Sequence, residues 1–131
     1  MMALDTNVLV RFLVADDPEQ TRRARRRIEK AVAQGETLHL TEIALVETVW
    51  VLERGYRFQR PDIAIVLRKL LSARQLSFSS TDRLVRALSR YEKGKGGFAD
   101  YLLCESSLEA GCEAVLTFDE ALLKERGFLM P

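Results

Sequence analysis

Short apolar segments alternate with longer amphipathic segments along the chain. The apolar segments cover residues 1–4, 38–40, 76–79 and 114–118, and residues 128–130 close the sequence in the same way. Apolar residues dominate these segments, as they do in strands that are covered on both faces. Because such strands alternate with helical segments, the pattern predicts an α/β fold with a mainly parallel sheet between helices.

The amphipathic segments repeat apolar positions every three or four residues, which is typical of helices. They predict helices over residues 8–13, 19–34, 41–54, 62–73, 81–91 and 98–110, with a short helix before residue 128. Thr41 is suited to cap the start of one helix and either Thr81 or Ser80 the start of another, and Gly35, Gly55 and Gly111 are suited to end helices. One stripe of the helix over residues 19–34 is expected to face the core: Ala24, Ile28, Ala31 and Val32.

Size and composition are those of an ordinary globular domain. The chain has 131 residues, of which 47% are hydrophobic and 30% charged, so we expect a single domain over residues 1–131. No apolar run approaches the roughly 20 residues that span a membrane. The opening residues include Asp5, Asn7 and Arg11 and lack a basic leading segment, so we expect no export and a cytoplasmic protein.

Cysteine, histidine and net charge narrow the chemistry further. Cys104 and Cys112 stand without a second pair or a histidine cluster, which excludes a zinc ribbon and favours reduced packing residues. The only histidine, His39, falls within a predicted strand and is expected to pack there. The net charge is +1, so the chain as a whole is no polyanion binder, although basic residues concentrate between residues 22 and 27.

Four carboxylates occupy positions where an isolated charge is unexpected. Asp5 and Asp119 follow predicted strands, at the sheet edge where ligands of α/β proteins collect. Glu47 has apolar neighbours three and four residues away on its helix, which predicts an apolar surrounding. Asp100 falls in the first turn of a helix. Each alone has an ordinary explanation, as a helix cap for the aspartates or as a buried ion pair for Glu47, but together they favour one site.

The chemistry of these side chains indicates a metal. Hard oxygen donors without a histidine or thiol cluster suit Mg²⁺ or Mn²⁺ and disfavour zinc. A cation would also relieve the repulsion among clustered carboxylates. Such a site suits hydrolysis of a phosphodiester bond, in which a metal activates water and stabilises the departing oxygen.

The same residues carry a family resemblance over essentially the whole chain. Asp5-Thr6-Asn7, Glu47 in Val-Glu-Thr-Val-Trp-Val-Leu, Phe98-Ala99-Asp100 and Thr117-Phe118-Asp119 resemble the ordered acidic motifs of PIN-domain ribonucleases. The opening Leu-Asp-Thr-Asn-Val-Leu-Val-Arg is similar to that of VapC toxins from bacterial toxin–antitoxin pairs. The resemblance implies a three-layer α/β/α sandwich and a Mg²⁺- or Mn²⁺-dependent endoribonuclease that inhibits translation.

The resemblance also implies roles and partners. Asp5, Glu47, Asp100 and Asp119 would be catalytic and would bind the metal, with support from Thr6, Asn7 and Thr117. A cognate VapB-like antitoxin would occlude the active site, and the toxin would form a homodimer. Gly97 departs from relatives that carry another acid at this position, which leaves the number of metals open.

RNA must also be held through its phosphates, and two basic segments could do so. Arg22 and Arg26 belong to the basic run of the second helix, although a solvated face in which Glu19 pairs with Arg23 is the simpler expectation there. Lys93 and Lys95 lie in a glycine-rich stretch, expected to be flexible, that leads to Asp100.

Other functions fit the sequence less well. A phospho-acceptor receiver domain would have paired acids after its first strand, whereas Asp5 stands alone. A haloacid-dehalogenase phosphatase would have a second aspartate where Asn7 stands. A non-catalytic PIN-fold module that binds another protein is the alternative that remains.

Overall fold

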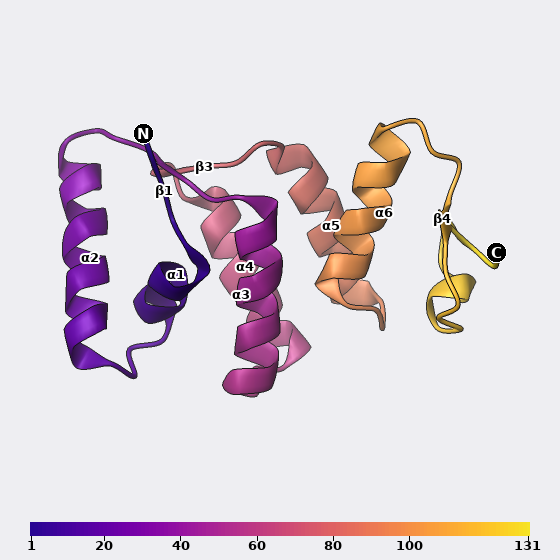
Figure 1. Ribbon diagram of the computed structural model, residues 1–131, viewed down its shortest axis with the longest axis horizontal. Helices are drawn as coiled ribbons and strands as arrows, with labels where there is room; N and C mark the ends of the chain where they lie inside the picture. Colours follow the sequence, from indigo (N-terminus) through magenta and orange to yellow (C-terminus); the bar gives the residue numbers. More distant parts are fainter. The chain divides into compact units, whose positions relative to one another are not determined.

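The computed structural model describes all residues, 1–131, and divides into two units, Met1–Ser79 and Ser80–Pro131 (Figure 1). Every strand pair in both units is parallel. Helices and strands follow one another in the predicted order. The prediction of an α/β fold with parallel strands is therefore confirmed.

The first unit contains a three-stranded parallel sheet in the order β1-β2-β3. Its strands are β1 (Met2–Ala3), β2 (Leu38–His39) and β3 (Leu76–Ser77). Its helices are α1 (Thr6–Leu13), α2 (Pro18–Ala33), α3 (Glu42–Gly55) and α4 (Arg60–Ser72). Helix α1 packs against both α2 and α3, and α3 packs against α4. Because α1 packs against α3, residues near the start of the chain lie next to residues 42–55.

The strands are shorter than the apolar segments that predicted them. Each spans two residues, but the backbone hydrogen bonds continue beyond them, from Leu4 N to the His39 carbonyl at 2.9 Å and from Leu40 N to the Ser77 carbonyl at 2.9 Å. In the predicted strand over residues 114–118, Val115 and Leu116 pair with Phe128 and Leu129, and Thr117 N also donates to the Leu129 carbonyl at 2.9 Å. Phe118 is 80% exposed, so its apolar side chain marks no buried strand.

The capping signals predicted several helix ends correctly. The Thr41 hydroxyl accepts a hydrogen bond from Ala44 N, and the Ser80 hydroxyl accepts one from Arg83 N. Gly35 follows α2 with a φ of 68°, a backbone conformation that glycine adopts without strain. The stripe predicted on α2 is buried at Ala24, Ile28 and Ala31 but not at Val32, which lies at its edge in the last turn and is 49% exposed.

The second unit contains α5 (Thr81–Lys93) and α6 (Phe98–Glu109), which pack against each other. It also contains the parallel pair β4 (Val115–Leu116) and β5 (Phe128–Leu129), joined through the short 3₁₀ helix η1 (Leu122–Lys124). A small core of Cys104, Leu122 and Phe128, with Leu108 and Val115 at its edge, connects α6 to this pair.

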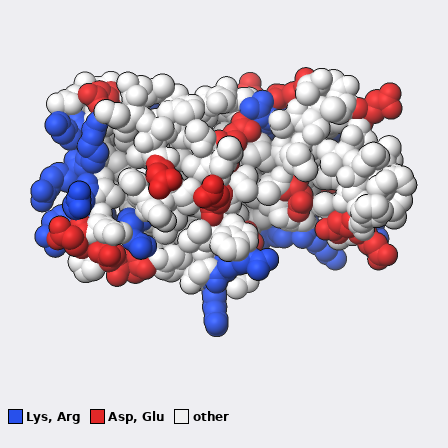
Figure 2. Space-filling model, in the orientation of Figure 1, with Lys and Arg blue, Asp and Glu red and all other residues white.

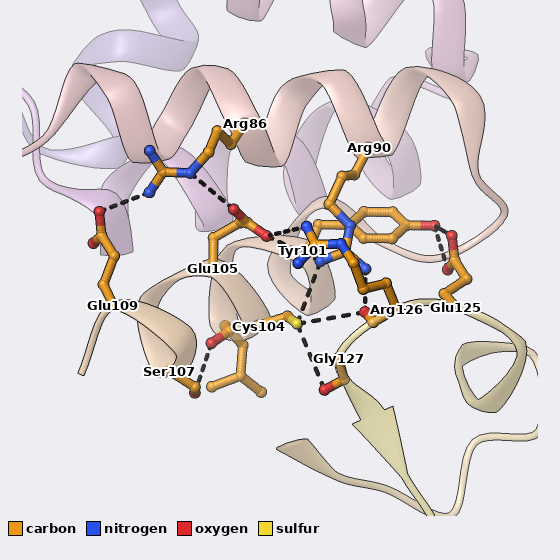
Figure 3. A network of polar contacts seen from close by, with 11 residues as sticks. Arg86, Arg90, Tyr101, Cys104, Glu105, Ser107, Glu109, Glu125, Arg126 and Gly127 are labelled. Atoms are coloured by element: carbon orange, nitrogen blue, oxygen red, sulfur yellow. Dashed lines mark hydrogen bonds and ion pairs between the residues drawn. The ribbon is translucent and has the colours of Figure 1, made fainter. Parts of the chain in front are cut away.

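A buried carboxylate, which the sequence analysis did not single out, lies in the second unit (Figure 3). Glu105 on α6 is 4% exposed and accepts hydrogen bonds from Arg86 Nε at 2.9 Å, Arg90 Nη1 at 3.0 Å and Arg126 Nη2 at 3.3 Å. Burial alone would raise the pKa of Glu105, but the hydrogen bonds from Arg86 and Arg90 and the charges of Arg126 and Arg90 outweigh it and lower the pKa. The cluster ties α5, α6 and the segment before β5 together.

Both cysteines are free, as predicted, and Cys104 is buried, but Cys112 is exposed, so its prediction as a packing residue is wrong. None of the helices is long and apolar enough to cross a membrane.

Candidate active site

Asp5 occupies the N-cap position of α1, directly after β1 and Leu4. Its backbone has the extended conformation of a cap, with φ −76° and ψ 155°, yet its carboxylate accepts no capping hydrogen bond. The side chain is exposed. Asp17, at the same position of α2, does accept a bond from Gln20 N at 3.0 Å. Helix capping therefore explains why an aspartate stands at position 17, but it does not explain the aspartate at position 5.

Thr6 and Glu47 are joined by a hydrogen bond. The Thr6 hydroxyl, on a residue only 8% exposed, donates to Glu47 Oε2 at 3.2 Å. This bond connects α1 to α3, which are packed against each other. Because Thr6 directly follows Asp5 in the chain, the bond brings Glu47 to the N-terminal end of α1. Two of the four predicted acids are thus held at the same end of one helix.

The predicted surroundings of Glu47 are wrong. Glu47 is exposed, and two of the neighbours expected to make its face apolar, Ile43 and Trp50, are 72% and 58% exposed. The buried residues of α3 include Ala44 and Thr48. Glu47 therefore lies at the solvent side of α3, since its helix buries a neighbouring face. Because Glu47 is exposed, the free-energy cost of burying a carboxylate provides no argument for a metal at this position.

Asp100 is the third residue of α6, as predicted, and is half-buried. Its Oδ2 accepts a hydrogen bond from Gly97 N at 2.9 Å. The loop before it is held by Tyr101, whose hydroxyl accepts from Gly96 N at 2.9 Å and donates to Glu125 Oε2 at 2.6 Å (Figure 3). A side chain at Gly94 would overlap that hydroxyl. The glycines expected to provide flexibility thus allow a close approach of the backbone to Tyr101.

Two residues, Thr117 and Phe118, separate Asp119 from the end of β4, and Asp119 is exposed. Its backbone N donates to Thr117 Oγ1 at 3.0 Å, and its Oδ1 accepts from Ala121 N at 2.9 Å. The carboxylate therefore forms a turn at the start of the segment that leads to η1. The bond from Ala121 N goes to Oδ1, and Oδ2 takes no part in it. Thr117 fixes the backbone that carries this acid.

The predicted basic residues are all exposed, and Figure 2 shows that many blue side chains gather over α2. Arg22 pairs with Glu19 at 3.7 Å, so the pairing expected between Glu19 and Arg23 is wrong. Lys93 ends α5, and Lys95 lies in the glycine-rich loop before α6.

The donor set fits a hard divalent cation. Asp5, Glu47, Asp100 and Asp119 provide only oxygen atoms, and neither Asp5 nor Glu47 is paired with an arginine or lysine. Asp5 and Glu47 belong to the first unit, whereas Asp100 and Asp119 belong to the second. Within neither unit do three or more side chains of the metal-binding types come together. The first unit alone thus offers an incomplete ligand set.

The sequence of this chain matches known proteins over nearly its whole length. Residues 2–129 match the family model described as PIN domain. Over 128 residues the chain is 30% identical to a VapC ribonuclease of Aquifex aeolicus (strain VF5), and the alignment covers 98% of this chain and 93% of that protein. The family match includes all four carboxylates and runs through both units. The chain belongs to the PIN-domain family and is similar to VapC ribonucleases, as its acidic motifs predicted.

Proposed function

We propose that this protein is a metal-dependent endoribonuclease that cleaves RNA phosphodiester bonds. The observation that carries the proposal is the pair of carboxylates at the N-terminal end of α1, in a chain that belongs to the PIN-domain family. There the Asp5 carboxylate has no capping role, and Thr6 holds Glu47 at the same helix end. The similarity to a VapC ribonuclease supports RNA as the substrate.

The roles we assign follow from the oxygen atoms that each residue offers. Asp5, Asp100 and Asp119 bind Mg²⁺ or Mn²⁺ directly or through water, and Glu47 is a further ligand or orients the attacking water. A bound divalent cation would lower the pKa of that water and stabilise the departing oxygen. Thr6 orients Glu47 through its hydrogen bond, and Thr117 holds the backbone of Asp119. A supporting role for Asn7 rests on the family resemblance alone.

The test is RNA cleavage by purified Asp5→Asn protein, with Asp17→Asn as the matched control. Both aspartates stand at helix N-caps, but only Asp17 caps its helix. We expect wild type and Asp17→Asn to cleave single-stranded RNA with Mg²⁺ or Mn²⁺ and not with EDTA. Asp5→Asn should lose at least about 100-fold in rate, the low end of what a positioned catalytic group contributes. Full metal-dependent activity of Asp5→Asn, free of contaminating nuclease, would refute the assignment.

The cellular role we propose is that of a VapC-like toxin in the cytoplasm. It inhibits translation, forms a homodimer and is neutralised by a VapB-like antitoxin. The similarity to a VapC ribonuclease supports this role. Induction should stop growth, and co-expression of the cognate antitoxin should restore growth. Continued growth on induction of wild type, at a protein level matched to Asp5→Asn, would count against the toxin role.

A non-catalytic module that binds another protein is the second candidate, and one observation favours it. Ile43 and Trp50 expose large apolar side chains on α3, as surfaces that contact a partner do. Titration of Mn²⁺ into wild type and Glu47→Gln separates the two functions. A weaker affinity in the variant, with RNA turnover by wild type, supports the nuclease. An unchanged affinity without turnover supports the module.

A further inference from the structure

The basic helix α2 has two different arginine faces. One face borders a hollow lined by Arg22, Arg25 and Arg26 together with Glu29, and Arg22 is paired with Glu19. The other face borders a groove between α1 and α2. Carboxylates compensate part of the positive charge on both faces, Glu19 and Glu29 on the first and Asp16 and Glu36 on the second. The sequence alone could not distinguish these faces, since it showed one continuous basic run.

The groove between α1 and α2 is lined by arginines and neutral side chains, without a carboxylate. Its polar residues are Asn7 and Arg11 of α1 and Gln20, Arg23 and Arg27 of α2. All five project from helices that pack against each other. The arginines of this groove attract a polyanion, and the nearest carboxylates, Asp16 and Glu36, lie against Arg11 and Arg27.

The charge available in this groove comes from two of its three arginines. Arg11 is held in place, since its Nε donates to Gln20 Oε1 at 2.6 Å and its Nη1 lies 3.3 Å from Asp16. Arg23 is exposed and forms no ion pair. Arg27 has one long contact, 3.8 Å to Glu36, in which both side chains are more than 40% exposed. Such an exposed pair is weak and is easily exchanged for another anion.

The groove begins at the candidate active site. Asn7, which lines it, is two residues after Asp5 and directly follows Thr6, the partner of Glu47. Arg23 and Arg27 are one helical turn apart, about 6 Å along the axis, so they can contact successive phosphates of one strand. No aromatic side chain lines the groove. It therefore lacks the stacking platforms through which proteins bind the bases of single strands.

We propose that the groove between α1 and α2 binds the phosphate backbone of single-stranded RNA next to the active site, with Arg23 and Arg27 as the phosphate contacts. The proposal rests on the ribonuclease function proposed above. Arg22 and Arg26 were the candidates from this run on sequence grounds, and the proposal replaces them with two other residues of the run. The groove increases the affinity for RNA and orients the strand, and it does not select the base sequence.

The test measures binding without cleavage. A fluorescently labelled single-stranded RNA is titrated with protein in EDTA, and the dissociation constant is determined by anisotropy at several salt concentrations. For single strands the slope of log K against log salt is about −0.7 per phosphate contact, so Arg23→Ala/Arg27→Ala should reduce its magnitude by about 1.4. The control Arg25→Ala/Lys30→Ala removes the same charge from the same helix outside the groove and should leave the slope unchanged.

Three results would overturn the proposal. Equal effects of both double variants would mean that general helix charge, and no particular groove, binds RNA. A slope reduced only by Arg22→Ala/Arg26→Ala would place the strand on the opposite face. Unchanged RNA binding by Arg23→Ala/Arg27→Ala, with loss of a protein partner instead, would make the groove a protein-docking site. The cleavage assay with Asp5→Asn decides the nuclease function separately, because no binding result in EDTA depends on turnover.

Discussion

Replacing Glu105 with glutamine should destabilise the second unit strongly. The carboxylate is 4% exposed and accepts hydrogen bonds from three arginines. Glutamine keeps the volume and one oxygen acceptor but removes the charge. Arg90, whose side chain is 15% exposed, then loses its carboxylate partner in a largely desolvated place. An uncompensated buried charge is among the few single changes that cost several kcal/mol.

The loss of unfolding free energy in Glu105→Gln depends on how exposed the three arginine partners of Glu105 are. Breaking a buried ion pair costs about 3–5 kcal/mol, and exposed pairs contribute far less. Because Arg126 is 67% exposed and Arg86 45% exposed, we expect the low end of that range, about 3 kcal/mol. With a urea dependence of about 2 kcal/mol per molar, the midpoint of unfolding should fall by about 1.5 M.

The effect of Glu105→Gln should depend on pH in a defined direction. Arginine contacts outweigh burial and hold the pKa of Glu105 below its ordinary value of 4.5 in the folded protein. The stabilisation is therefore fully present above pH 4.5 and is lost as the pH falls through the lower folded pKa. The difference between wild type and variant should be full at pH 7 and should shrink at pH 3.

Glu109→Gln is the matched control, because Glu109 lies one turn further along α6 and also accepts from two arginines, Arg83 and Arg86. Its side chain is 38% exposed, so its loss should move the urea midpoint much less. The reasoning fails if both variants shift the midpoint equally. It also fails if the effect of Glu105→Gln is as large at pH 3 as at pH 7.

Three further changes test single contacts. Thr6→Val removes the hydrogen bond to Glu47, worth about 1 kcal/mol, and should weaken Mn²⁺ binding roughly fivefold by calorimetry. Gly94→Ala should lower the melting temperature, because the added methyl group would overlap the Tyr101 hydroxyl. A thiol reagent should modify Cys112 quickly in the native protein and the buried cysteine only after unfolding.

Each of these changes has its own control. Thr6→Ser keeps the hydroxyl and should retain wild-type metal affinity. Gly55→Ala adds a methyl group with only an ordinary contact, 3.8 Å from Val51, and should leave the melting temperature nearly unchanged. Cys112→Ser should abolish the fast thiol reaction. An effect of Gly55→Ala as large as that of Gly94→Ala would show that the loop around Gly94 is not specially crowded.

Local signals in the sequence predicted the elements of the fold well. A hydroxyl before an apolar run became the cap of α3, and the glycine after the stripe of α2 became the turn at φ 68°. These signals act within a few residues, so they can be interpreted without knowing what the chain packs against. Exposure could not be predicted in the same way. Glu47 has apolar neighbours in sequence, but which face of α3 is buried depends on α1 and α4.

Glu105, the acid that the sequence did not single out, has partners that lie far from it along the chain. The partners of Glu105 lie 15, 19 and 21 residues away along the chain, so no local pattern connects them. One signal was nevertheless available: Glu105 falls on the same helical stripe as Phe98, Tyr101 and Leu102, all of them buried. An acid on an apolar stripe needs a cation, and here arginines of the same unit provide it.

The same comparison strengthens the interpretation of Asp5. Glu105 is buried and fully paired, and it stabilises the protein without facing solvent. Asp5 and Glu47 are exposed, lie at one helix end and have no arginine or lysine partner. Carboxylates that are neither buried nor paired with a cation contribute little to folding, so the fold of this chain does not account for Asp5 and Glu47. A metal ion is the ligand that their oxygen atoms fit, and Thr6→Val tests this directly because it leaves both carboxylates in place.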